Sequence, residues 1–236
     1  MSQVATPYAD TRDMYTVHIM FRREYALLPG LVRSVPPKDT DRAQTIAAHI
    51  EMVNLILHHH HSGEDAVLWP RLLTRAPKEI DPVVHLVEGH HRGIENLLAE
   101  SDVLLSAWTE AASSEDGESL AQTLQRLAVA LYEHMGLEER LILPVVERHI
   151  FATEWHEMVE HAAAGIPQQI APVVAGMVMY EGGLHAVPEE MRTVLGEVAP
   201  QAYAAHCERV HGTRTPPRAA DVIVGTPFVG VPGFLS

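Results

Sequence analysis

The stretch HHSGEDAVLWP, residues 60–70, and the stretch HMGLEERLILP, residues 134–144, follow one pattern. Each begins with His and has Glu four residues later, a second acid directly after that Glu, and Pro six residues after the first Glu. In an α-helix, residues four apart lie on one face, about 6 Å apart along the axis. This spacing suits two ligands of a single metal centre.

The residues around each pattern predict which helix face is buried. Aliphatic residues precede both patterns at alternating steps of four and three, as in the core stripe of a helix bundle: Ile46, Ile50, Val53 and Leu57, then Leu120, Leu124, Leu127 and Leu131. Two other helical segments place a single His in such a stripe, His18 and His91. The predicted metal ligands are therefore His18, His60, Glu64, His91, His134 and Glu138.

The predicted fold is all-α: an antiparallel, up-down-up-down four-helix bundle with a C-terminal helical extension. Helical periodicity covers residues 11–34, 41–76, 81–112 and 118–149, and polar, Pro-containing or Gly-containing clusters separate these segments. No segment alternates as a strand does, and the short connections favour antiparallel neighbours. In such a bundle the six predicted ligands lie at one level, where ionised carboxylates are costly unless a cation neutralises them.

The chain divides into a predicted bundle, residues 11–150, and a C-terminal extension, residues 151–236. The extension has helical patterns at about residues 167–181 and 188–211, and its last 25 residues form a tail rich in Pro and Gly. Pro70 lies inside the second predicted helix and is expected to kink it.

Composition excludes several classes of partner. A formal net charge of −14 argues against nucleic acid, and no basic amphipathic face points to a membrane surface. The first residues lack a signal-peptide pattern, and the most apolar stretch, IAPVVAGMVMY, is too short to span a bilayer. The single cysteine, Cys207, excludes an internal disulfide and predicts a cytoplasmic protein. The oligomeric state cannot be predicted from these features.

The chain has 16 histidines, and most of them lack a partner at ligand spacing. His49 lies eleven residues before His60, about 16 Å away along a helix, and so at the wrong level. His58, His59 and His61 point off the stripe and are interpreted as solvated or supporting residues. No ligand role is predicted for His85, His149, His156, His161, His185, His206 and His211.

Nitrogen and oxygen ligands without thiolate fit iron, manganese or zinc. A structural zinc needs only four ligands and commonly includes Cys. Six ligands, two of them carboxylates that can bridge, better suit two iron ions.

The chain resembles the hemerythrin-like (HHE cation-binding) family over about residues 11–150. The resemblance rests on His18, HHSGEDAVLWP from His60, EGHHRGIENLL around His91, and HMGLEERLILP from His134. With its C-terminal extension the chain resembles actinobacterial hemerythrin-like proteins. The resemblance implies a non-haem di-iron centre, oxo- or hydroxo-bridged, with Glu64 and Glu138 as bridges and His as terminal ligands. It also implies a small diatomic molecule or peroxide as the bound ligand.

Two positions depart from the oxygen-carrying members of that family. Val87 stands four residues before His91, where those members have a fifth His, and the last helix has His-x-x-x-Glu instead of His-x-x-x-x-Asp. His90, Tyr25 or a water could fill the gap. An open position would favour reaction or sensing over reversible carriage.

The expected function is binding of O₂, peroxide or NO at a di-iron centre, for sensing, carriage or detoxification. Whether the chain is an enzyme stays open, and a peroxide- or NO-consuming oxidoreductase is the competing reading. A non-redox or iron-homeostasis protein, with zinc or manganese in the site, is a further alternative, as is a helical scaffold without metal.

Overall fold

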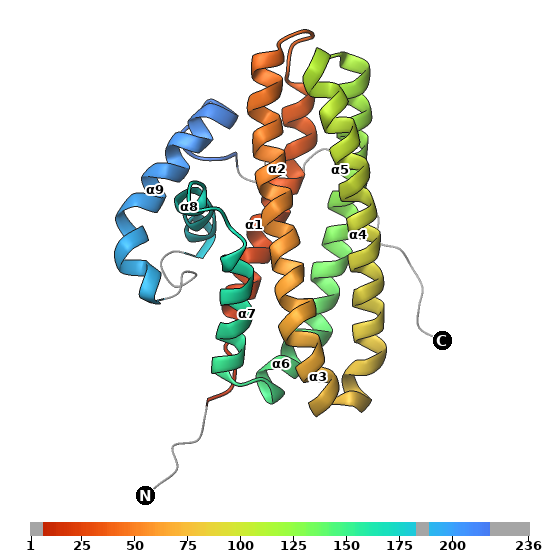
Figure 1. The fold of residues 1–236 in the computed structure, drawn as a ribbon, viewed down its shortest axis with the longest axis vertical. Coiled ribbons are helices and arrows are strands. Elements are labelled where there is room, and N and C mark those ends of the chain that lie inside the picture. The colour runs from red at the N-terminus through yellow and green to blue at the C-terminus, as the bar shows by residue number, and fades with distance from the viewer. Residues whose placement is uncertain (1–6, 183–188, 218–236) are drawn as a thin grey trace, which may run out of the picture.

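The structure, a computed structural model, describes residues 7–182 and 189–217. Four long helices lie side by side along the long axis of the molecule (Figure 1). They are α1 (Arg12–Arg33), α2 (Thr40–Gly63), α4 (Pro77–Ala111) and α5 (Ser114–Leu137). The described residues contain no strand, only an isolated bridge between Tyr8 and Phe151, so the predicted all-α class is confirmed.

Of the two hydrophobic core clusters, the one that holds both aliphatic stripes lies mainly between the four long helices. Helix α1 packs against α2 and α5, and α4 packs against the same two helices. The aliphatic stripes that the sequence predicts face this core, because all eight of their side chains are fully buried: Ile46, Ile50, Val53, Leu57, Leu120, Leu124, Leu127 and Leu131. Burying one such side chain stabilises the fold by about 1.5–3 kcal/mol. The same stripes bring His60 and His134 into the middle of the bundle.

Helices α2 and α5 each end in a π-helical turn that begins at a predicted ligand. These turns are η1 (Glu64–Leu68) and η2 (Glu138–Ile142), and the short helices α3 (Trp69–Arg75) and α6 (Leu143–His149) follow them. Pro70 and Pro144 lie at the start of the short helices and lack the N–H that an α-helix would use. The residue before each Pro instead donates its N–H to the carbonyl of the ligand Glu, five residues back. The irregularity predicted at Pro70 thus takes the form of a π turn, and the sequence repeat produces it twice.

Two helices begin earlier than the sequence pattern predicts. Helix α4 begins at Pro77 rather than near residue 81, because Pro at the first helical position has a backbone angle suited to a helix start. Helix α5 begins at Ser114 rather than near residue 118, and Ser113 caps it by accepting a hydrogen bond from the Asp116 N–H at 3.1 Å. Both starts lie within segments expected to be connections.

In the described part of the C-terminal extension, three helices follow the bundle. Helices α8 (Ala171–Gly182) and α9 (Glu189–His211) agree with the predicted segments, whereas α7 (Ala152–Ala164) was not predicted. Its start has a local signal, because Glu154 accepts a hydrogen bond from the Phe151 N–H at 3.0 Å. Helix α7 packs on α2 at Gly63, where a Cβ would lie 3.1 Å from the Met158 carbonyl. Helix α8 packs on α1, and α9 packs on α8 and α2. Residues 218–236 of the predicted tail lie outside the described residues.

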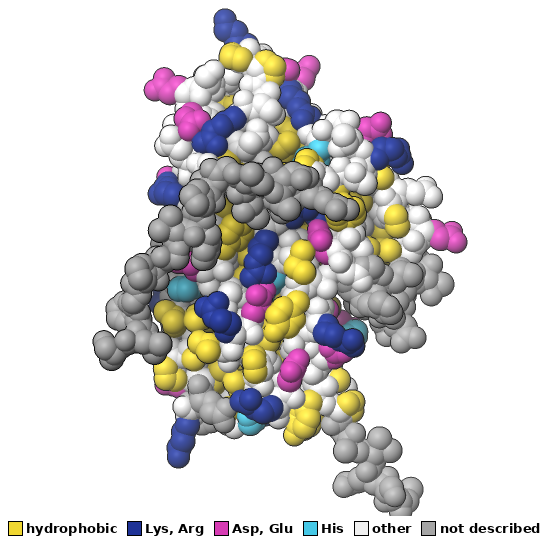
Figure 2. Space-filling model, turned by 180° about the vertical axis from the view of Figure 1, so that it is seen from behind, with side chains coloured by type: hydrophobic (Ala, Val, Ile, Leu, Met, Phe, Trp, Pro, Cys, Tyr) yellow, Lys and Arg dark blue, Asp and Glu magenta, His cyan; other side chains and the backbone are white. Residues whose placement is uncertain are grey.

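The molecular surface mixes charges of both signs. On the face opposite to that of Figure 1, Lys and Arg side chains are interspersed with acidic and hydrophobic ones (Figure 2). Among the helices described, none combines the length and the apolar character needed to cross a bilayer.

Candidate metal centre

All six predicted ligands meet in the core of the four long helices. Their ligand atoms belong to two groups, and within each group the atoms lie no more than 4.8 Å apart. One group comprises His18, His60, Glu64 and Glu138, and the other comprises His61, Glu64, His91 and His134. Glu64 is common to both. The two groups together can therefore hold two neighbouring cations that share one carboxylate.

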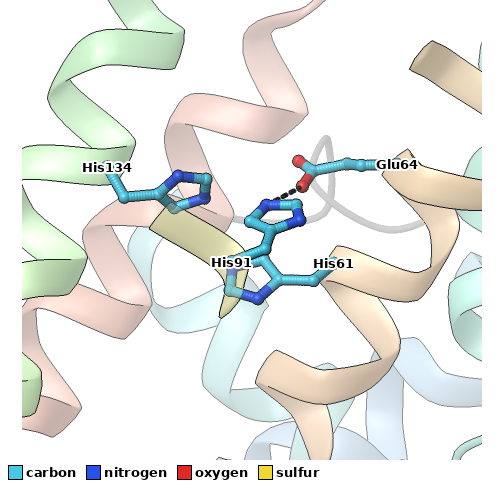
Figure 3. Close-up of side chains that lie close together, drawn as sticks. All are labelled: His61, Glu64, His91 and His134. Atoms are coloured by element: carbon cyan, nitrogen blue, oxygen red, sulfur yellow. Dashed lines mark ion pairs between the residues drawn. The ribbon is translucent and has the colours of Figure 1, made fainter. Parts of the chain in front are cut away.

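His61, interpreted from the sequence as a solvated or supporting residue, lies in the second ligand group. Its side chain is buried rather than solvated, and its ring stacks on the His91 ring with centroids 4.1 Å apart. The His134 ring lies 4.9 Å from it. Figure 3 shows the His91 and His61 rings next to each other, with the Glu64 carboxylate and the His134 ring on either side. A fifth imidazole therefore faces the centre, from α2 rather than from α4.

Glu64 lies between the two histidines on its own helix. It is four residues after His60 and three after His61, and at about 100° per residue its direction falls between theirs. Its Oε1 lies 3.3 Å from Nε2 of His60, and its Oε2 lies 3.5 Å from Nε2 of His91. The two carboxylate oxygens thus face different ligand groups, which is the arrangement of a bridging carboxylate.

The inward-facing atoms are buried and have no hydrogen-bond partner within the described part of the chain. This holds for Nε2 of all five histidines and for both oxygens of Glu64 and of Glu138. The Glu138 Oε2 lies 3.5 Å from Nε2 of His18 and 3.4 Å from Nε2 of His134. Ligands bound at about 2.0–2.2 Å to one ion lie about 3.0–3.5 Å from each other. Polar atoms this deeply buried are normally paired, so their spacing and lack of partners fit a cation between them.

The second acid of each repeat orients a histidine from another helix. Asp65 Oδ1 lies 2.9 Å from Nδ1 of His91, and Glu139 Oε1 lies 2.9 Å from Nδ1 of His18. Arg22 holds Glu139 with two hydrogen bonds of 2.7 and 3.0 Å. A proton on Nδ1 leaves the Nε2 lone pair directed at the centre, as carboxylates do for metal-bound histidines. The sequence analysis noted these acids as part of the repeat but assigned them no role.

The two inward carboxylates repel each other in the absence of a cation. Burial and the neighbouring Glu64 charge raise the pKa of Glu138 well above its usual value. Burial also disfavours the charge of Glu64, but His60 and His91 outweigh it and lower the pKa of Glu64. Without metal, these opposite shifts favour a proton on Glu138 over one on Glu64. A cation replaces that proton, so metal binding is expected to release protons.

Three of the inward histidines are neutral at pH 7. Burial lowers the pKa of His60 to about 4 and the pKa values of His61 and His134 well below 6.5. His91 differs: burial opposes its charge, but hydrogen bonds to Asp65 and Glu64 raise its pKa to about 10. Neutral imidazoles are the form that binds metal.

The metal-free protein is expected to lose stability as the pH falls from about 6.5 to about 4. In this window the unfolded chain protonates histidines that the folded chain keeps neutral, so acid favours unfolding, with His60 alone contributing about 3 kcal/mol. Glu138 acts in the opposite direction through its raised pKa, but the buried histidines with lowered pKa values outnumber it. The measurement is denaturant unfolding of chelator-treated protein across this pH range, and stability that rises on acidification would contradict the prediction.

The two residues proposed from the sequence as replacements for a fifth His take other positions. The Tyr25 hydroxyl donates a hydrogen bond of 3.0 Å to Asn54. The His90 ring lies 6.1 Å from the His134 ring and belongs to neither ligand group. His58, His85, His156 and His161 are exposed, as expected for residues without a ligand role, and His185 lies outside the described residues. His49, His206 and His211 form a separate cluster.

The fold and the paired ligand groups define the class: an all-helical protein with a candidate His/carboxylate cation centre. The model of the hemerythrin HHE cation binding domain matches residues 9–146, and the chain belongs to this family. An uncharacterized protein of Dictyostelium discoideum is similar, with 23% identity over 138 residues that cover 55% of this chain and 54% of the relative. The chain thus spans about half the length of that curated relative. No solved structure is a significant match.

Proposed function

We propose that this chain is a cytoplasmic, non-haem di-iron protein that binds O₂, peroxide or NO between its four long helices. The proposed ligands are the six residues predicted from the sequence together with His61. Glu64 and Glu138 are the bridging carboxylates, and the five histidines are terminal ligands. The proposal includes the antiparallel, up-down-up-down course of α1, α2, α4 and α5 as the frame of the centre, residues 11–150 as the bundle and residues 151–236 as an extension.

The observation that carries the proposal is the set of unpartnered ligand atoms. Five imidazole nitrogens and four carboxylate oxygens face one another in a buried core with no hydrogen bonds to satisfy them within the described residues. A mixed nitrogen and oxygen set without thiolate suits iron, and two shared carboxylates suit a pair of ions. Iron held there supplies redox chemistry and a position for a small ligand.

An apolar pocket supports access by a small, uncharged molecule. A pocket of about 210 Å³ reaches His60, and α1, α2, α7 and α8 line it with residues that include Met20, Ile56, Met158 and Val174. O₂ and NO are poorly hydrated and partition into such surroundings. Phe21, Val87, Ile94 and Leu131 are fully buried in the bundle. These residues exclude bulk water from the ligand atoms.

With His61 near the proposed centre, a fifth histidine is no longer missing. An absent fifth His favoured reaction over reversible carriage, because it would leave an additional open position. Five imidazoles face the centre once His61 is included. Catalysis therefore needs its own test, and the peroxide- or NO-consuming enzyme remains the second candidate because the pocket gives a path to His60.

The test is metal analysis and optical spectroscopy of protein purified from iron-replete cells. We expect about two iron ions per chain and the absorption of an oxo-bridged diferric centre. Stopped-flow mixing with peroxide and with NO then separates binding, which saturates at one equivalent, from turnover, which continues. Protein that takes up zinc or manganese but no iron under these conditions contradicts the proposal.

A further inference from the structure

A second group of candidate ligand residues lies away from the proposed di-iron centre, where the C-terminal helix α9 meets α1 and α2. Glu24 of α1, His49 of α2 and His211 of α9 place one ligand atom each within 4.8 Å of the others. His49 is eleven residues before His60, about 16 Å along α2, so this group is distinct from the centre. We propose that Glu24, His49 and His211 form a second metal site, which takes a divalent transition cation, most suitably zinc.

Two atoms of this cluster carry the argument. Oε2 of Glu24 and Nε2 of His49 are buried and lack hydrogen-bond partners in the described ranges, although they lie 3.2 Å apart. The contact has ligand-to-ligand spacing without hydrogen-bond alignment, as at the di-iron centre. The His211 ring stands edge-on to the His49 ring, with centroids 5.9 Å apart. Two imidazoles and one carboxylate match the protein ligands of open zinc sites, which keep a fourth position for water or substrate.

The neighbouring residues prepare these groups as ligands. Arg23 and the Tyr203 hydroxyl donate hydrogen bonds to Oε1 of Glu24, which leaves Oε2 for the cation. Arg23 also pairs with Glu181, so its positive charge is shared between two carboxylates. Nδ1 of His49 lies 3.0 Å from Nε2 of His206, so a proton on that Nδ1 leaves the His49 Nε2 free of hydrogen.

Helix α9 is fixed so that His211 reaches the bundle. The Arg42 guanidinium donates hydrogen bonds to the carbonyls of Arg209 and Val210, in the last turn of α9. A cation bound by one residue from each of α1, α2 and α9 therefore links the C-terminal extension to the bundle. This gives the extension a role that the four-helix core alone does not explain.

The experiment titrates the iron-loaded full-length protein with Zn²⁺ and measures zinc and iron per chain. We expect about one zinc per chain beyond the di-iron centre, with an affinity that falls by more than 100-fold in His211→Ala and in Glu24→Gln and by 10–100-fold in His206→Ala. His211→Ala changes a partly exposed residue in the last turn of α9, so it keeps the test valid if the buried Glu24→Gln variant does not fold. The matched control is His156→Ala, an exposed histidine four residues before Glu160 on α7.

The iron content separates this inference from the proposed function. Iron content and spectrum are expected to stay the same in the His211→Ala variant, and zinc is expected to raise the melting temperature of the unaltered chain but not of that variant. No additional zinc in the unaltered chain, or zinc bound equally tightly by His211→Ala, overturns the second site. A failure of iron loading contradicts the proposed function. The comparison of zinc binding between the unaltered chain and His211→Ala still decides the second site.

Discussion

A Glu64→Gln variant is expected to lose both metal ions from the centre. Glu64 is the residue that the two ligand groups share, with one oxygen 3.3 Å from His60 and the other 3.5 Å from His91. Glutamine keeps the shape but has one weak acceptor and no charge, so two cations would remain close together without their bridging anion. We expect affinity for each ion to fall by more than 100-fold, since even supporting residues change metal affinity by 10–100-fold. The measurement is iron per chain after loading and desalting.

The matched control for Glu64→Gln is Asp65→Asn, at the next position. Asp65 contacts Nδ1 of His91 and is half exposed, so its loss should weaken one ion by about 10–100-fold without emptying the centre. Bound metal is expected to stabilise the unaltered chain by about 4 kcal/mol when free metal exceeds the dissociation constant 1,000-fold. In the presence of the same metal, Glu64→Gln is expected to lack this stabilisation. Equal iron content in Glu64→Gln and the unaltered chain would contradict the shared role of Glu64.

A His61→Ala variant is expected to lose iron, whereas a His90→Ala variant is expected to keep it. His61 is buried against His91 and His134, whereas His90 is outside both ligand groups. We expect His61→Ala to lower the iron content from about two ions per chain to about one, because one ion loses a terminal ligand. His90→Ala should retain both ions. Circular dichroism and thermal unfolding check that both variants fold.

The reverse outcome of this comparison would identify a different fifth ligand. If His90→Ala loses iron and His61→Ala does not, then α4 supplies the fifth imidazole. If neither variant loses iron, the centre uses only the six ligands predicted from the sequence.

The sequence was sufficient for the all-α class and for the group of six side chains that meet in the bundle. Local rules decide both: steps of three and four place aliphatic residues in the core, and a four-residue step places His60 with Glu64 and His134 with Glu138. The pattern occurs twice, which excludes chance more strongly than any single histidine. The prolines six residues after each Glu also have a local effect, because they convert the next turn to a π turn.

His61 was not predicted as a metal ligand because each helix was assigned only one inward-facing histidine. A core-facing stripe contains one residue at each interval of three or four. His60 was therefore assigned to the core, and its neighbour His61 was assigned a position outside it. Glu64 points between the two histidines and belongs to both ligand groups, so both histidines can face the proposed centre. The three-residue step from His61 to Glu64 was a usable signal. The acids Asp65 and Glu139 carried a comparable signal, because both copies of the repeat contain them.

Contacts between distant segments could not be predicted from local rules. His49, His206 and His211 have no ligand spacing in the sequence, and they meet only because α9 folds back onto α1 and α2. The same limit applies to the pocket at His60, which α7 and α8 line together with the bundle. Sequence periodicity gives the buried face of a helix but not the partner that covers it.

Anomalous diffraction at the iron edge, from crystals of the iron-loaded full-length protein, shows whether the bundle core holds two iron ions. The proposed centre predicts two adjacent peaks, one contacted by His18 and His60, the other by His61, His91 and His134, with Glu64 between them. A single peak, no peak in the bundle core, or iron held by other residues would contradict the account.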